Sequence, residues 1–181
     1  TVVAGSDADR EPDDELARGR HERRRRGDGR LDGSRGRVPA GAGGIGTFAI
    51  QLAKHIGAHV ITAASLTNHA YLRDIGADEI IDYNARDFTQ LVTNCDAVFD
   101  TVGGDVAQKS FAVLKPGGRA AFIASGAQAP TPNRDDVTSL RPPVGRARRH
   151  LDRIAQLFQA GAIRPPEVKL YRLSEAADAH R

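Results

Sequence analysis

At 181 residues with 40% hydrophobic side chains, the chain is long enough for one domain with a full core and too short for two large ones. A formal net charge of +3 is small for this length and does not indicate a nucleic-acid-binding face. The single cysteine, Cys95, excludes an intrachain disulfide framework and a multi-cysteine zinc site, and no apolar run approaches the roughly 20 residues of a membrane span. We therefore expect a cytoplasmic protein that binds neither nucleic acid nor membrane.

Residues 1–39 differ sharply from the rest of the chain. Arg23 to Arg26 form an unbroken basic run, acids between Asp7 and Glu15 offset its charge, and apolar residues are sparse and without a period. We therefore predict a disordered or non-native leader. Because a GC-rich coding region translated out of frame is rich in arginine, glycine and alanine, we also hypothesise a frame-shift product, which the nucleotide sequence would test.

The run Ala40 to Gly46 contains Gly41-x-Gly43-x-x-Gly46 at the start of an amphipathic segment. In this spacing a tight turn brings a pyrophosphate to the positive end of a helix, so the run indicates a dinucleotide site. A buried apolar strand is expected before such a loop, but residues 33–39 read GSRGRVP. We therefore predict that this first strand is missing or degenerate.

From residue 40 onward, strands and helices alternate at intervals of roughly 20 residues, which is the pattern of βαβ units and a parallel sheet. A helix is expected over 44–55, and its predicted buried face consists of Ile45, Phe48, Ala49, Leu52 and Ala53. The elements that follow are a strand over 59–64, a helix over 68–75, a strand over 79–82, a helix over 87–93, a strand over 95–100, a helix over 104–114 and a strand over 119–124. The predicted fold class is therefore α/β with a doubly wound parallel sheet.

Beyond Gly126 the pattern loosens into a proline-rich loop over 130–143. A helix is expected over 146–160, an extended piece over 168–173, and a further helix that Ser174 could cap. The sequence stops one turn into that last helix. We therefore expect residues 40–181 to form a dinucleotide-binding domain that is truncated at its carboxyl end.

Four ordered motifs carry a family resemblance: the glycine loop, Phe99 to Gly104 (FDTVGG), Leu114 to Arg119 (LKPGGR) and Leu173 to His180 (LSEAADAH). With them, residues 40–181 resemble the nucleotide-binding Rossmann domain of a medium-chain dehydrogenase/reductase, of the zinc-independent NADPH:quinone oxidoreductase type. In that family a separate amino-terminal domain forms the other wall of the substrate cleft. No part of this sequence matches that domain, so we expect it to be lacking.

The resemblance implies NADP(H) as the cofactor and a set of residues that bind it. Members of the family place backbone amides at the positions of Gly43, Gly44 and Ile45 against the pyrophosphate, while Gly41 and Gly46 complete the loop. The alternative is that these glycines only form a tight turn between strand and helix, and that Gly46 serves helix packing.

The group at the cofactor's 2′ position is read after the second strand, where an NAD site places an acid. The stretch 63–68 has no acid, which favours NADP, and Ser65 and Tyr83 match family positions that reach the 2′-phosphate. Asn68 stands where relatives can carry a lysine, so a charge-assisted contact is lost there. The alternatives are a helix cap for Ser65 and a half-buried edge aromatic for Tyr83.

By resemblance, Thr101, Val102, Ser125 and Gly126 would line the ribose and nicotinamide, although a plain loop role is also open for each of them. Asp100 is expected to hold a turn rather than act as a base. The histidines show no metal-ligand spacing, so no metal is predicted, and the catalytic residues stay unknown.

The function that these observations favour is an NADPH-dependent oxidoreductase that passes hydride to an electron-poor acceptor such as a quinone, an enone or a similar carbonyl compound. The first alternative is a catalytically incompetent NADP(H)-binding fragment or sensor. A methyltransferase is a more distant one, because it normally has an acid at the end of the second strand. Relatives commonly pair through the sheet edge of this domain, so a homodimer is also open.

Overall fold

A computed structural model describes residues 35–39, 41–166, 168 and 170–179. Within these residues the chain forms one sheet in the order β3-β2-β1-β4-β5-β6, and every neighbouring pair of strands is parallel. The strands are β1 (Arg35–Pro39), β2 (His59–Ala64), β3 (Glu79–Asp82), β4 (Cys95–Asp100), β5 (Leu114–Phe122) and β6 (Thr138–Leu140). This order confirms the predicted Rossmann-type parallel α/β fold.

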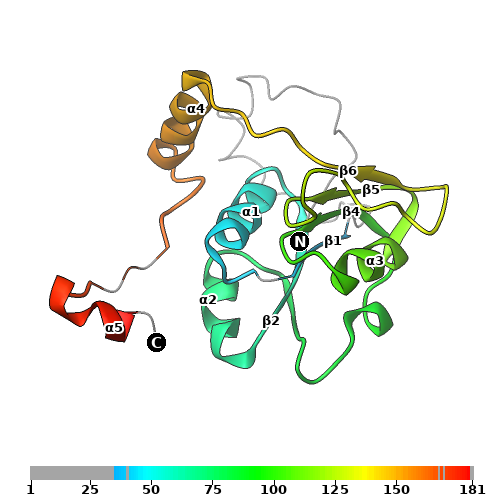
Figure 1. Ribbon diagram of the computed structural model, residues 1–181, viewed down its shortest axis with the longest axis horizontal. Coiled ribbons are helices and arrows are strands. Elements are labelled where there is room, and N and C mark those ends of the chain that lie inside the picture. The colour runs from blue at the N-terminus through cyan, green and yellow to red at the C-terminus, as the bar shows by residue number, and fades with distance from the viewer. Residues whose placement is uncertain (1–34, 40, 167, 169, 180–181) are drawn as a thin grey trace, which may run out of the picture.

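Helices cover both faces of the sheet, with α1 and α2 on one side and α3 on the other (Figure 1). The helices are α1 (Gly44–His55), α2 (His69–Asp74), α3 (Asp105–Ala112), α4 (Arg148–Gln159) and α5 (Ala176–Ala179), and single 3-10 turns occur at η3 (Leu66–Asn68), η4 (Phe88–Gln90) and η5 (Leu173–Glu175). Among the described residues, no helix is long and apolar enough to cross a membrane.

The strand β2 shows how the core is divided between the two faces. Val60 and Ala64 pack with Ile50 of α1 and Leu72 of α2, and the residues between them, such as Ile61, pack into the cluster on the α3 side. A strand buried on both faces needs apolar side chains in succession rather than in alternation. This is why residues 59–64 could be identified as a strand from sequence.

The first strand, predicted to be missing or degenerate, is present as β1 at the centre of the sheet. It pairs with β2 from Arg35 to Pro39 and with β4 from Arg35 to Arg37. Sheet pairing uses backbone N–H and C=O groups, which residues carry whatever their side chains, and the one proline stands at the strand's last position. The backbone of 35–39 thus belongs to the sheet, while the rest of the predicted leader, 1–34, lies outside the described residues.

The helix α1 has the predicted bounds, and its predicted buried face is only partly correct: Ala53 is buried, and Phe48 and Ala49 are half-buried. Ile45 and Leu52 are exposed, whereas Thr47 and Gln51 are buried. Both polar side chains have partners: the Thr47 hydroxyl lies 3.1 Å from the Tyr71 hydroxyl, and Gln51 donates to the carbonyls of Thr47 and Arg164. Hydrogen bonding removes the cost of burying them, so apolar spacing alone misplaced part of the buried face.

Three further elements differ from expectation. The helix predicted over 87–93 is only the turn η4, which ends at Gln90; Asn94, just before β4, has a left-handed φ of 57°. The strand predicted over 119–124 begins earlier, at Leu114. The strand β6 lies inside the predicted loop over 130–143, where it pairs with residues 119–121 of β5.

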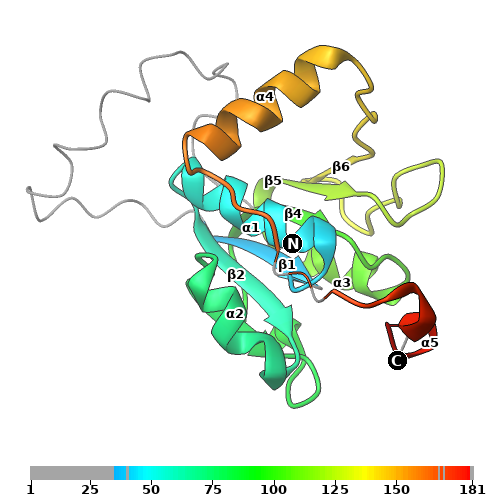
Figure 2. The same ribbon diagram turned by 90° about the vertical axis from the view of Figure 1, so that its left-hand side faces the viewer.

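The carboxyl-terminal part begins with α4, whose Phe158 packs against Phe48 of α1, and the chain then passes α1 on its way to α5 (Figure 2). The described residues of the extended piece predicted over 168–173 form no strand, and only its last residue, Leu173, belongs to η5. Ser174 lies inside η5 and therefore does not cap the helix as predicted. The turn is closed instead by Glu175, whose Oε2 accepts from the Arg172 backbone N–H at 2.7 Å.

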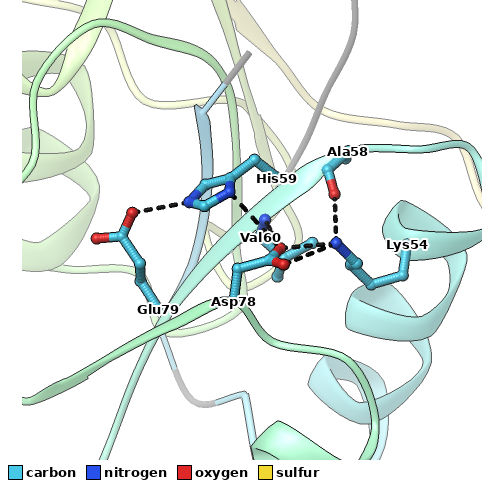
Figure 3. Close-up of polar contacts among 6 residues, drawn as sticks. All are labelled: Lys54, Ala58, His59, Val60, Asp78 and Glu79. Atoms are coloured by element: carbon cyan, nitrogen blue, oxygen red, sulfur yellow. Dashed lines mark hydrogen bonds and ion pairs between the residues drawn. The ribbon is translucent and has the colours of Figure 1, made fainter. Parts of the chain in front are cut away.

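A polar cluster joins the amino ends of β2 and β3 to the end of α1 (Figure 3). Asp78 accepts from Lys54 Nζ at 2.8 and 2.9 Å and from the Val60 backbone N–H at 2.6 Å. Lys54 also donates to the Ala58 carbonyl at 3.0 Å. The Asp78 carboxylate therefore ties one helix and two strands together where the chain enters the sheet.

Replacing Asp78 with alanine should destabilise the domain by about 1–2 kcal/mol, because the buried Val60 N–H loses a charged acceptor. Glu79 offers a control: its exposed carboxylate pairs with His59 at 2.7 Å, so Glu79→Gln should cost less than about 0.5 kcal/mol. Urea unfolding of the three proteins measures both values. Equal losses in the two variants would contradict the special role of Asp78.

A second carboxylate, Asp87, links η4 to α3 on the opposite face. Its Oδ1 accepts from the backbone N–H of Thr89 at 3.0 Å and from the Thr89 hydroxyl at 2.9 Å, and its Oδ2 pairs with Lys109. The hydrogen bond from Lys109, followed by those from Thr89, lowers the pKa of Asp87 from 3.8 to about 2. The ionised form is thus favoured by folding.

Because the folded pKa of Asp87 lies below the unfolded one, its contribution to stability is complete above about pH 4 and is lost as the pH falls toward about 2. Asp87→Asn lacks this titration. The difference in melting temperature between wild type and Asp87→Asn should therefore shrink over that acid range and stay constant between pH 5 and 7. A constant difference down to pH 2 would refute the assignment.

Candidate functional site

All the candidate binding residues lie where the carboxyl ends of the strands meet, which we call the carboxyl edge of the sheet. Because every neighbouring pair of strands is parallel, the carboxyl ends of the strands lie at the same edge. The loop 41–46 follows β1, and the other candidates follow β2 (Ser65, Asn68), β3 (Tyr83), β4 (Thr101, Val102) and β5 (Ser125, Gly126). The fold thus brings four further loops to the edge that carries the glycine loop.

The glycines of the loop have two different environments. Gly41 is buried, and a Cβ atom there would lie 2.3 Å from Thr62 Oγ1 and 3.1 Å from Ile50 Cδ1. Gly46 is buried too, within the first turn of α1. Gly43 and Gly44 are exposed, and a Cβ atom at Gly44 would meet nothing within 4 Å. Packing therefore requires a glycine at 41, whereas the exposed positions leave open space at the start of α1.

The start of α1 offers backbone donors to that space. Gly43 is the residue before the helix, and its carbonyl accepts the first helical bond, from Thr47 N at 2.9 Å. The N–H groups of a helix's first turn have no partner within the helix and lie at the positive end of its dipole. No acid occupies the first turn of α1, so this positive end stays uncompensated.

The loop after β2 carries hydroxyl and amide groups in contact with one another. The Ser65 hydroxyl accepts from Asn68 Nδ2 at 3.1 Å and lies 3.0 Å from the Thr67 hydroxyl. Ser65 precedes η3 but its side chain makes no capping bond, so the helix-cap alternative is not what the structure shows. This loop therefore presents polar groups without any acid.

The turn after β4 is held by Asp100. Its Oδ1 accepts from Val102 N at 2.6 Å and from Gly103 N at 3.0 Å, and the residue is fully buried. These bonds confirm the expected turn role. Oδ2 has no hydrogen-bond partner among the described residues. Asp100 thereby fixes the backbone next to Val102, whose side chain is about half exposed.

The remaining candidates differ in how firmly they are held. The Ser125 hydroxyl donates to the Gln128 carbonyl at 2.8 Å, and Gly126 has a left-handed φ of 75°. Tyr83 is 58% exposed, so it is not the half-buried edge aromatic of the alternative interpretation.

Two polar residues at this edge were missed by sequence reasoning. Thr67 contacts the candidate Ser65, and the serine-threonine pair in the loop could have revealed it. Arg141 follows β6, and its Nη1 donates to the Phe122 carbonyl at 3.0 Å. A strand of only three residues within a proline-rich stretch offered no periodic signal for it.

The part of the chain that the structure describes contains no group of three or more histidine, cysteine, aspartate or glutamate side chains arranged to hold a metal ion. Cys95 is fully buried at the start of β4 among core residues.

Comparison with protein families gives a match to the family described as zinc-binding dehydrogenase, over residues 75–181, more than half of the chain. A solved quinone oxidoreductase from Coxiella burnetii is 34% identical, with a TM-score of 0.66, over 82% of this chain and 48% of that one. These matches identify the same fold by two independent routes.

Two curated relatives are reductases. The NADPH-dependent alkenal/one oxidoreductase of Arabidopsis thaliana is 41% identical over 55% of this chain and 25% of its own length. The 2-haloacrylate reductase of a Burkholderia species is 32% identical over 80% of this chain and 50% of its own length. The chain thus spans at most about half the length of these relatives.

The two kinds of glycine should respond differently to alanine. Gly41→Ala should destabilise the domain by about 1–3 kcal/mol because its Cβ overlaps Thr62. Gly44→Ala meets open space and should be neutral or stabilising by up to about 1 kcal/mol. Denaturant unfolding measures the free energy of unfolding of both variants. If Gly44→Ala were as destabilising as Gly41→Ala, a side chain at position 44 would not lie in open space.

Proposed function

Since the chain belongs to the zinc-binding dehydrogenase family, a branch of the medium-chain dehydrogenases/reductases, we propose that it binds NADPH at the carboxyl edge of its sheet. We propose further that it is the nucleotide-binding domain of an oxidoreductase that transfers hydride to a quinone, an enone or a similar carbonyl compound. The observation that carries this proposal is the start of α1. It is exposed, its first turn contains no acid, and it follows β1, a central strand of the parallel sheet.

The residues at the edge fit a dinucleotide. Open space at Gly44 leaves room for a phosphate to approach the backbone, and the α1 dipole favours a negative charge there. Gly43 has a φ of −76°, a conformation open to any residue, so conformation does not explain the glycine. Close approach of a ligand does explain it, since a side chain at this position would hold a phosphate off.

The loop after β2 supports NADPH over NADH. An acid that would bond the ribose hydroxyls of NAD is absent from residues 63–69, so a 2′-phosphate meets no like charge there. Ser65, Asn68 and the exposed Tyr83 offer it hydrogen-bond donors. None of these is a cation, so we propose recognition by neutral groups.

Bound NADPH would supply the hydride, and the chain's own residues would position it. The start of α1 holds the pyrophosphate, while Asp100 fixes the turn that presents Val102 toward the crevice. Ser125 and Gly126, one strand further, continue the same edge. We assign no catalytic acid or base to this chain.

A second candidate is NADPH binding without turnover, as in a sensor. The observation that favours it is that the contacts described at this edge serve the pyrophosphate and the 2′ group, and no acid or base is assigned among them. Such a site would hold the cofactor without itself promoting transfer of the hydride.

We also propose that two copies pair through β6. This strand pairs with β5 and is the last strand at that end of the sheet. Leu140 on it is exposed. Edge strands carry unpaired backbone groups that a second strand can satisfy.

Calorimetric titration should show NADPH binding at least about tenfold tighter than NADH. Gly43→Asp should abolish binding of both cofactors, because it places a like charge against the pyrophosphate. Ser65→Ala should lower the affinity for NADPH and leave the affinity for NADH unchanged. Asn94→Asp adds the same charge before β4, at the opposite edge, and is the matched control that should bind normally.

Unaltered NADPH binding by Gly43→Asp would refute the site. With binding established, NADPH oxidation in the presence of 1,4-naphthoquinone supports the reductase, and binding without oxidation supports the sensor.

A further inference from the structure

Arg141 is a cation held at the same edge of the sheet as the proposed cofactor site. It directly follows β6, is half-buried, and its Nη1 donates to the carbonyl of Phe122, the last residue of β5, at 3.0 Å. This bond ties the guanidinium to the carboxyl end of the neighbouring strand. Its position is therefore set by two strands rather than by a loop.

The strand order places Arg141 beyond the proposed nicotinamide position. With the pyrophosphate at β1 and the 2′ group on the β2 side, the nicotinamide half extends toward β4 and β5. The end of β6 lies one strand further, about 5 Å past β5. This step rests on the proposed function and puts Arg141 on the side where the hydride acceptor would enter.

The loops that follow β5 and β6 at this edge carry no acid that could neutralise Arg141, and Asp136, which precedes β6, pairs with Arg134. Residues 123–133, which follow β5, and residues 141–147, which follow β6, contain no aspartate or glutamate. Among the described residues no carboxylate pairs with Arg141, and its guanidinium donates to a backbone carbonyl. A guanidinium has further N–H donors in a planar fork that matches a carboxylate.

A purely structural role for Arg141, in which it only links β5 to β6, explains fewer of these features than binding of an anion does. Bracing β5 against β6 requires only one N–H donor, which a neutral glutamine also has. Bracing leaves the positive charge and the other N–H donors of the guanidinium unused, and an anion that binds them explains why an arginine stands there. We propose that Arg141 binds an anionic group of the acceptor, a carboxylate or a sulfonate, and so selects acidic enones or quinones.

The test uses the full chain saturated with NADP⁺ and an inert pair of probes, 2-naphthoate and its neutral counterpart 2-naphthamide. Calorimetry should show that Arg141→Gln weakens 2-naphthoate by about tenfold and changes 2-naphthamide by less than twofold. Arg149→Gln, which removes the same charge from the exposed surface of α4, should leave both affinities unchanged.

Arg141→Lys keeps the positive charge but loses the planar fork, so it should weaken 2-naphthoate by a few-fold and leave 2-naphthamide unaffected. This variant also serves if Arg141→Gln fails to fold. Turnover offers a second readout: the preference for 1,4-naphthoquinone-2-sulfonate over 1,4-naphthoquinone should fall in both Arg141 variants and persist in Arg149→Gln.

Three results would overturn the proposal: equal weakening of both probes by Arg141→Gln, equal effects of the Arg141 and Arg149 variants, or no binding of 2-naphthoate to wild type. Failure of NADP⁺ to bind contradicts the proposed function and this inference with it. Binding of NADP⁺ without discrimination between the probes contradicts this inference alone.

Discussion

Parallel strand pairing is the constraint from which the proposed site follows. A parallel neighbour can be reached only by a crossover, so each connection must leave the carboxyl edge, pass over one face and re-enter at the amino edge. In this chain α1, α2 and α3 provide such crossovers on both faces. Loops from distant parts of the sequence are thereby delivered to a single edge, where the positive start of α1 already lies. Residues as far apart as Gly43 and Ser125 can serve one ligand because of this geometry alone.

Close packing then decides which residues remain available at that edge. Gly41 lets the first loop lie against Thr62 and Ile50, and buried alanines such as Ala53 of α1 and Ala64 of β2 let the helix and the sheet approach closely. Asp100 stabilises the turn after β4, because its Oδ1 accepts hydrogen bonds from the backbone N–H groups of Val102 and Gly103. The groups that remain available are the backbone at Gly43 and Gly44, the polar groups after β2 and the half-buried guanidinium of Arg141. This division follows from contacts between segments and not from residue type, since glycines fall on both sides of it.

The strands that were predicted correctly from the sequence are those whose apolar side chains indicate that they are buried. Residues 59–64 and 95–100 are mostly apolar because both of their faces are largely covered, and the strand over 79–82 carries two isoleucines at its centre; the structure gives all three the expected bounds. The first strand was not predicted because backbone groups make its pairing, while its sequence, RGRVP, contains no apolar run. Part of the buried face of α1 was misplaced for a related reason: Thr47 and Gln51 are buried with hydrogen-bond partners that lie far away in sequence, Tyr71 and Arg164.

By itself the sequence determined the family, the α/β class and most of the alternation of strands and helices between residues 44 and 122, because motifs and apolar runs are local properties that each segment carries alone. The match to the zinc-binding dehydrogenase family over residues 75–181 agrees with what those motifs indicated. Only the tertiary structure decided that a strand stands at 35–39, that Gly41 serves packing while Gly44 faces open space, and that Arg141 is tied to the end of β5. The physical reason is that these are relations between distant segments, set by backbone pairing and close contact, which the pattern within any one segment does not contain.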